Sequence, residues 1–143
     1  MTQNRIDAVI SALNGFEPSR NDVDNVQWLY ETFKDFRLLP GRESVAPAIF
    51  ALLERFPEAD LGSPGPLVHE LEAMSEYQPL LRASLRRQPT DLTVWMVNRI
   101  LNANPPADER SMWLSELQSA GEHPKSPEST RESVAEFLEH QNA

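Results

Sequence analysis

Residues 90–103, TDLTVWMVNRILNA, decide the fold of this chain. Their apolar side chains cover nearly the whole circumference of the helix that the stretch predicts, and such a helix is usually central and buried. Thr90 or Asp91 can cap its first turn, and Pro105-Pro106 lies just beyond its end. We therefore expect the other helices to pack around residues 90–103.

Helical spacing of apolar residues continues along the rest of the chain, and Pro or Gly marks most boundaries. No stretch alternates apolar and polar residues convincingly, as a half-buried strand would. The sequence predicts one all-α domain over residues 1–143, either a compact bundle or a short HEAT-like stack of helical hairpins. It shows no convincing repeat with the period of HEAT or armadillo proteins. The eight or so expected helices span 6–13, 23–36, 44–56, 66–74, 77–88, 90–103, 108–120 and 128–138.

Several single residues carry further structural expectations. Trp28 lies off the apolar stripe of its helix, which makes it the candidate for an exposed aromatic side chain at an interface. Ser63 is expected to cap the fourth helix or its preceding turn, Pro66 to fit that helix's first turn, and Gly121 to close the seventh helix. The stripe of the second helix that should face the core comprises Val23, Val26, Leu29, Tyr30, Phe33 and Phe36.

The charge of the chain restricts its partners. It carries 22 acidic and 13 basic residues, a formal net charge of -9, which disfavours nucleic acid and anionic membranes and favours basic partners.

The chain has no cysteine, which excludes disulfides, thiolate zinc sites and cysteine nucleophiles. The N-terminal residues do not resemble a signal peptide, and no segment reaches the ~20 apolar residues of a membrane helix. We expect a cytoplasmic protein.

Catalytic motifs are missing from the sequence. It contains neither the nucleophile elbow GxSxG, nor a phosphate-binding GxxxxGK[ST], nor GxGxxG. His69, His123 and His140 lack the spacing of a local metal site. We therefore expect no catalytic residue, no metal and no cofactor, and no enzymatic activity.

Acidic residues between positions 54 and 76 form the candidate binding surface. Only Arg55 formally opposes them, so they constitute either a solvated face or a docking surface that steers a basic partner. Arg82, Arg86 and Arg87 are expected to offset Glu70, Glu72 or Glu76, and contact with a phosphate is the alternative. Arg99, in the most apolar helix, is expected to be a structural clamp, with an anion site as the alternative. The acidic residues are Glu54, Glu58, Asp60, Glu70, Glu72 and Glu76.

A family resemblance adds a role. Residues 53–74, LERFPEADLGSPGPLVHELEAM, residues 77–103 and the pattern formed by Arg110, Trp113 and Leu114 resemble small immunity proteins of contact-dependent growth inhibition and related polymorphic toxin systems. The resemblance implies a monomer that binds one cognate toxin domain, often a nuclease, and blocks its active site or substrate surface. Nuclease domains need basic surfaces to hold phosphates, so an acidic inhibitor suits them. The alternative is a non-catalytic HEAT-like adaptor that binds a basic partner.

Overall fold

The computed structural model describes residues 2–19 and 21–142 and confirms the all-α prediction, with no strand in those ranges. Two short 3-10 helices, η1 (Phe36–Leu38) and η2 (Arg42–Val45), join the second and third α-helices. The eight α-helices are α1 (Thr2–Asn14), α2 (Asp22–Thr32), α3 (Ala46–Arg55), α4 (Gly65–Glu72), α5 (Tyr77–Arg87), α6 (Asp91–Asn102), α7 (Ala107–Glu122) and α8 (Glu128–Asn142).

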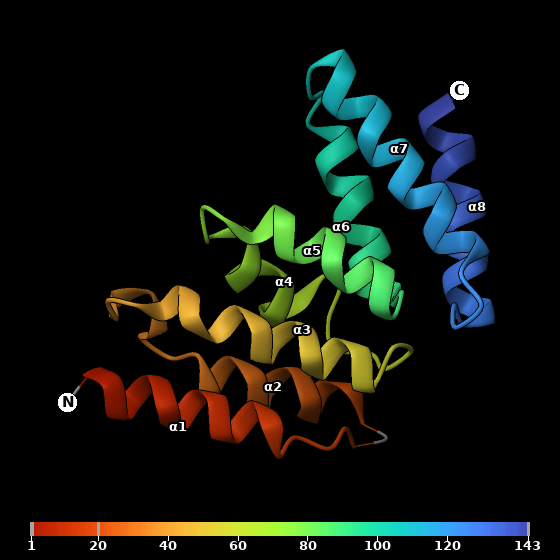
Figure 1. Cartoon of the computed structure of the whole chain (residues 1–143). Coiled ribbons are helices and arrows are strands. Elements are labelled where there is room, and N and C mark those ends of the chain that lie inside the picture. Colours follow the sequence, from red (N-terminus) through yellow and green to blue (C-terminus); the bar gives the residue numbers. More distant parts are fainter. Residues whose placement is uncertain (1, 20, 143) are drawn as a thin grey trace.

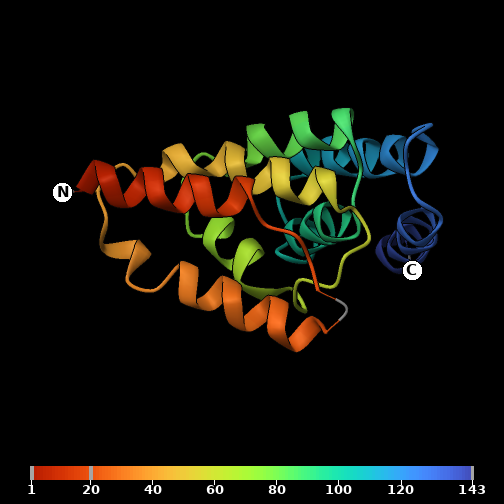
Figure 2. The same ribbon diagram turned by 90° about the horizontal axis from the view of Figure 1, so that it is seen from below.

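The helices form two rows (Figure 1 and Figure 2). In one row α1 packs on α3, α3 on α5, and α5 on α7, whereas α2 packs on α4 and α6 on α8 in the other. From α3 onward successive helices also pack on each other, as α3 with α4, α5 with α6 and α7 with α8, and the helices together form a compact all-α arrangement. The first five helices run across the view of Figure 1, and the last three stand upright against them.

Helix α6 lies at the junction of the two groups and packs on α5, α7 and α8. Its first turn begins as predicted with Thr90, whose Oγ1 accepts a hydrogen bond from the Thr93 N–H at 3.0 Å, while the Thr93 hydroxyl accepts one from the Thr90 N–H at 3.0 Å. This reciprocal capping box satisfies two backbone donors that would otherwise be unpaired. The buried apolar side chains of α6 are Leu92, Val94, Met96, Val97, Ile100 and Leu101.

The second helix differs from the prediction. It ends at Thr32, and its expected inward residues Val23 and Tyr30 are 69 % and 51 % exposed. Asn25 occupies the buried face instead, because its side chain accepts from the Ser19 N–H at 2.7 Å and donates to the Ser19 carbonyl at 3.0 Å. A buried amide with both groups hydrogen-bonded is tolerated in a core. Leu29, Phe33 and Phe36 of the predicted stripe are buried, so the apolar pattern placed part of the buried face correctly and missed Asn25.

The loop between α3 and α4 is held in one conformation by Gly62. Its φ is +123°, and a Cβ there would lie 2.2 Å from the Cα of Gly65. Only glycine fits both conditions. Leu61 is fully buried beneath the loop, and Pro66 lies in the first turn of α4 as predicted. Pro64, and not Ser63, precedes that helix at its cap position.

Gly121 does not close α7, which continues to Glu122. A Cβ at this position would lie 2.8 Å from Cγ1 of Val134 on α8. The glycine therefore permits the close approach of α7 and α8, so the prediction of a helix end here is wrong.

Candidate functional site

The six acidic residues of the predicted binding surface do not form one free surface. Glu54 lies on α3 and faces α5, where Arg87 donates from Nε and Nη2 to its two carboxylate oxygens at 2.9 Å each. The Ser84 hydroxyl donates to the same carboxylate at 2.8 Å. Glu54 therefore joins two packed helices within this chain.

Glu72 and Arg99 form a second bidentate pair. Arg99 donates from Nε and Nη2 to the Glu72 carboxylate at 2.8 Å each, which connects α6 to the last residue of α4. The hydrogen bond that Arg99 donates to Glu72 raises the pKa of the Arg99 guanidinium. Tyr77 lies beside the pair, and its burial raises the pKa of its phenol. With one edge of its guanidinium engaged in this way, Arg99 acts as a clamp on a helix end.

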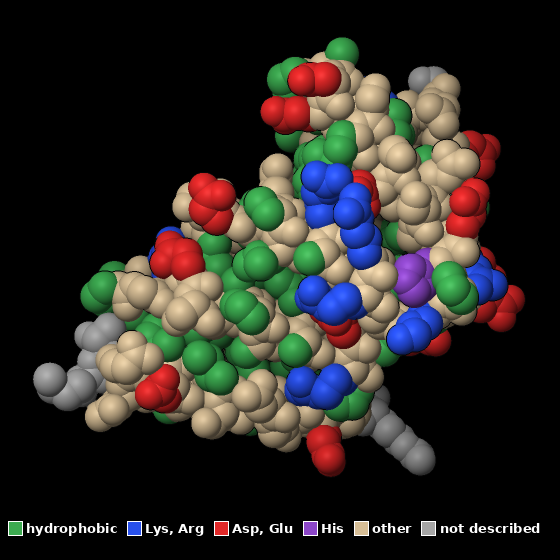
Figure 3. Space-filling view, in the orientation of Figure 1, with side chains coloured by type: hydrophobic (Ala, Val, Ile, Leu, Met, Phe, Trp, Pro, Cys, Tyr) green, Lys and Arg blue, Asp and Glu red, His purple; other side chains and the backbone are tan. Residues whose placement is uncertain are grey.

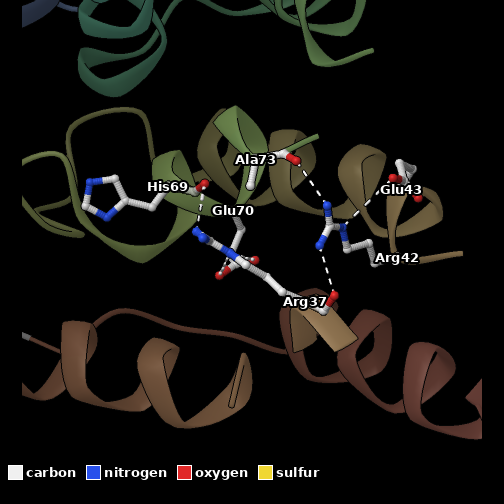
Figure 4. A network of polar contacts seen from close by, with 6 residues as sticks. All are labelled: Arg37, Arg42, Glu43, His69, Glu70 and Ala73. Atoms are coloured by element: carbon white, nitrogen blue, oxygen red, sulfur yellow. Dashed lines mark hydrogen bonds and ion pairs between the residues drawn. The ribbon is translucent and has the colours of Figure 1, made fainter. Parts of the chain in front are cut away.

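Glu70 belongs to a polar network that ties the two 3-10 helices to α4 (Figure 4). Arg37 approaches Glu70 with its Nε at 3.4 Å and donates to the His69 carbonyl at 3.3 Å. Arg42 spans the same junction, since it donates to the carbonyls of Arg37 and Ala73 at 3.0 and 3.1 Å. The carbonyls at the end of α4 thereby gain charged donors, which complement the negative end of the helix dipole.

The other three acidic residues are exposed but separated. Glu58 and Asp60 lie in the loop after α3, and Glu76 lies at the cap position before α5. Helices α3 and α5 run side by side in the same direction (Figure 1). Glu58 and Asp60 follow the C-terminal end of α3, whereas Glu76 precedes the N-terminal end of α5, so they lie at opposite ends of this helix pair. The structure therefore groups Glu58 with Asp60 and leaves Glu76 apart.

Trp28 is 37 % exposed, and two aromatic contacts connect it to the residue that precedes the acidic loop. Its ring packs against Phe16 with the centroids 5.0 Å apart, and Phe16 meets the edge of Phe56 at 6.3 Å. Phe56 ends α3, two residues before Glu58. Trp28 also borders a hollow of about 290 Å³ whose lining includes Glu17 and Asp24. We call Trp28, Glu17, Asp24, Glu58 and Asp60 the aromatic–acidic edge.

The predicted partners of the arginine cluster on α5 are wrong. Arg82 and Arg86 donate to Glu116 of α7 at 3.1 Å and 2.6 Å, and Arg87 pairs with Glu54, so none of the three offsets Glu70, Glu72 or Glu76. Burial alone would raise the pKa of Glu116, but the hydrogen bonds from Arg86 and Arg82 outweigh it and lower that pKa.

Sequence reasoning missed Glu116, although the pattern contained a signal. Glu116 lies between Trp113, Leu117 and Ala120 on one face of α7 and is itself buried. A carboxylate on an apolar helix stripe must be paired, and the cluster on α5 was the available source of cations.

Comparison with known proteins gives no assignment. No family model, curated protein or solved structure matches this chain. Within residues 2–19 and 21–142, no group of three or more His, Asp or Glu side chains is placed to hold a metal ion. In the same ranges no helix has the length and apolar character that crossing a bilayer requires. Function must therefore be argued from the surfaces that the two rows of helices present.

Proposed function

We propose that this chain is a non-catalytic immunity protein that binds and neutralises a cognate toxin domain with a basic surface, of which a nuclease domain is the expected class. The aromatic–acidic edge is its docking surface. Trp28 supplies an exposed ring against which an arginine or lysine of the toxin can stack, and the carboxylates of Glu17, Asp24, Glu58 and Asp60 can pair with further cations.

The observation that carries this proposal is an exposed tryptophan bordered by carboxylates. Tryptophan is enriched among the side chains that contribute most to protein–protein affinity, and its indole has a strong attraction for cations. The net charge of the chain also favours a basic partner. The ion pairs in the described residues join six arginines to five carboxylates and therefore nearly cancel each other's charge. The residues outside these pairs thus carry almost the same negative charge as the whole chain, which is -9.

Growth inhibition tests the proposal directly. The C-terminal domain of the large protein encoded beside this chain is expressed alone and then together with it. We expect toxicity from the first and rescue with a co-purifying 1:1 complex from the second. An absence of toxicity, or toxicity without rescue, contradicts the proposal.

The docking surface needs a charge reversal that does not disturb the fold. Glu54, Glu70 and Glu72 are unsuitable because each is paired with an arginine of the same chain. Glu17→Lys with Glu58→Lys changes two exposed carboxylates of the edge that make no hydrogen bond or ion pair among the described residues, and should slow association with the toxin most strongly at low salt. Glu132→Lys with Glu136→Lys on α8 makes the same change of charge at exposed positions outside the edge and serves as the control.

A HEAT-like adaptor is the second candidate, and the two rows of stacked hairpins favour it. Stacks of this kind present extended surfaces to partners. The neighbouring genes separate the candidates, because a large secreted toxin gene beside this one supports immunity and an operon of housekeeping genes supports the adaptor.

A further inference from the structure

A basic cleft lies where the C-terminal ends of α3, α5 and α7 converge. Figure 3 shows Lys and Arg side chains gathered on this face, with a histidine beside them. The cleft measures about 810 Å³ and is lined by four cations and a single carboxylate, which gives a local charge of +3 in a chain of net charge -9. Its charged lining residues are Arg55, Arg86, Arg87, Lys125 and Glu54.

Two of the guanidinium groups are fixed by carboxylates next to the cleft. Arg87 is held by Glu54 through Nε and Nη2, and Arg86 is held by Glu116 through Nη2 at 2.6 Å. A guanidinium has five N–H donors in a rigid plane, and these bonds use only part of them. The remaining N–H donors are thus held in a fixed orientation and are still available to a ligand. Binding a ligand through them therefore costs less side-chain conformational entropy.

Hydrogen bonds to its backbone position Lys125 at the cleft. The Lys125 N–H donates to Nδ1 of His123 at 3.0 Å, and the Lys125 carbonyl accepts from Gln88 at 2.8 Å. The other imidazole nitrogen, Nε2, lies 2.8 Å from the Arg86 carbonyl. A carbonyl can only accept and a backbone N–H can only donate, so the two contacts fit the tautomer that carries its proton on Nε2. His123 therefore links the end of α5 to the turn that carries Lys125.

The helix dipoles account for part of this arrangement. Cations are favoured in the last turn of a helix, where Arg55, Arg86 and Arg87 lie. Lys125 lies beyond the end of α7, however, and it is held in place by two hydrogen bonds to its backbone. When Glu116, which pairs with Arg86 beside the cleft, is added to the lining charge of +3, the region carries +2, so an excess of positive charge remains after Arg86 and Arg87 are paired.

We propose that the basic cleft binds a short acidic segment of a partner protein, whose carboxylates contact Arg55, Arg86 and Lys125. Arginine pairs with carboxylates through two parallel hydrogen bonds, and such charge-assisted bonds are stronger than neutral ones. A nucleic acid would extend beyond the cleft over a molecule of net charge -9, which repels a long polyanion. A short segment with two or three carboxylates would place its negative charge within the cleft and would avoid this repulsion. This proposal does not depend on the proposed toxin binding, because the cleft is basic whereas the proposed toxin-binding surface, the aromatic–acidic edge, is acidic.

The test uses the full chain and a fluorescently labelled synthetic peptide of eight residues that contains four glutamates. Fluorescence anisotropy at low salt should show saturable binding that weakens as salt is added. Arg86→Gln with Lys125→Gln should weaken the binding about tenfold or more, because two charged donors are lost. Arg82 still pairs with Glu116 in this variant, so the fold is expected to persist, and circular dichroism checks that it does.

The control removes the same two charges elsewhere. Arg5→Gln with Lys34→Gln changes two exposed cations that do not line the cleft, and should leave peptide binding within about twofold. The proposal is overturned by an absence of peptide binding, or by equal losses in both double variants. It is also overturned if a single-stranded oligonucleotide with the same number of charges binds more tightly than the peptide through Arg86 and Lys125.

Discussion

Glu116 offers the sharpest test of the interior of this protein. Its side chain is 9 % exposed, and one carboxylate oxygen, Oε1, accepts hydrogen bonds from Arg82 at 3.1 and 3.2 Å and from Arg86 at 2.6 Å. Glu116→Gln keeps the shape of the side chain and an acceptor oxygen but removes the negative charge. The two arginines on α5 then face an amide in place of a carboxylate.

The cost follows from the exposure of the partners. Breaking a fully buried ion pair costs about 3–5 kcal/mol because a charge is left without a partner in the interior. Arg82 and Arg86 are 40 % and 65 % exposed in their side chains, so water can solvate both when Glu116 is neutral. We therefore expect a loss of about 1–2 kcal/mol in the free energy of unfolding, which lies in the range of lost hydrogen bonds to charged groups.

Urea unfolding at pH 7 measures this loss as a lower midpoint with an unchanged slope. The pH dependence gives a second readout with a definite sign. The pKa of Glu116 is lowered in the folded chain from its ordinary value of 4.5, so the unfolded chain takes up this proton first as pH falls. The stability that its charge contributes is complete above pH 4.5 and is lost below it, so wild type and Glu116→Gln should converge in acid.

Glu136→Gln is the matched control, because this glutamate is exposed on α8. Its unfolding free energy should differ from wild type by less than about 0.5 kcal/mol. If Glu116→Gln were equally harmless at pH 7, or if its deficit persisted unchanged in acid, the carboxylate would not hold α5 to α7 as argued.

Three further changes test other parts of the molecule. Gly62→Ala should lower the unfolding free energy by at least about 1–3 kcal/mol, because alanine disfavours this positive φ and its Cβ would lie 2.2 Å from the Gly65 Cα; Gly15→Ala should be nearly neutral, and thermal unfolding compares the two. Thr90→Ala removes the capping box of α6 and should cost about 1 kcal/mol in urea unfolding, and an unchanged midpoint would refute that role. Trp28→Ala should weaken toxin binding by about 2 kcal/mol, or ~30-fold, in surface plasmon resonance, whereas Tyr30→Ala should not; equal effects would argue against the aromatic–acidic edge.

The parts of the fold that follow from the sequence are those where local pattern and tertiary packing agree. Helix α6 is apolar on nearly all sides, and it is buried at the junction of the two groups of helices, with Thr90 as its cap. Helix α2 shows the limit of the same reasoning. Leu29, Phe33 and Phe36 follow the apolar period and are buried, whereas Val23 and Tyr30 follow it and are exposed, and Asn25 is buried through its hydrogen bonds with Ser19. The apolar period does not reveal that a polar side chain is buried when the backbone of a preceding loop satisfies its hydrogen bonds.

The charge pairs were harder to predict for a different reason. Glu54 and Arg87 are 33 positions apart, Glu72 and Arg99 27, and Arg82 and Glu116 34. Each pair bridges helices of different hairpins, so its existence depends on the stacking order and on helix rotation. Sequence can show that buried or crowded charges need partners, but only the arrangement in space selects which residues those partners are.

The internal pairing changes what the acidity of the chain means. Counting carboxylates between positions 54 and 76 suggests one negative face, but Glu54, Glu70 and Glu72 are each opposed by an arginine at the junction of two elements. The charge available to a partner is what remains after this pairing, and it includes the aromatic–acidic edge, the basic cleft and separate exposed carboxylates such as Glu76, Glu132 and Glu136. A partner of either sign will associate faster at low salt, so salt dependence alone does not identify the surface used. The charge-reversed Glu17–Glu58 variant and the Arg86–Lys125 variant do, because each removes attraction from one surface while leaving the other intact.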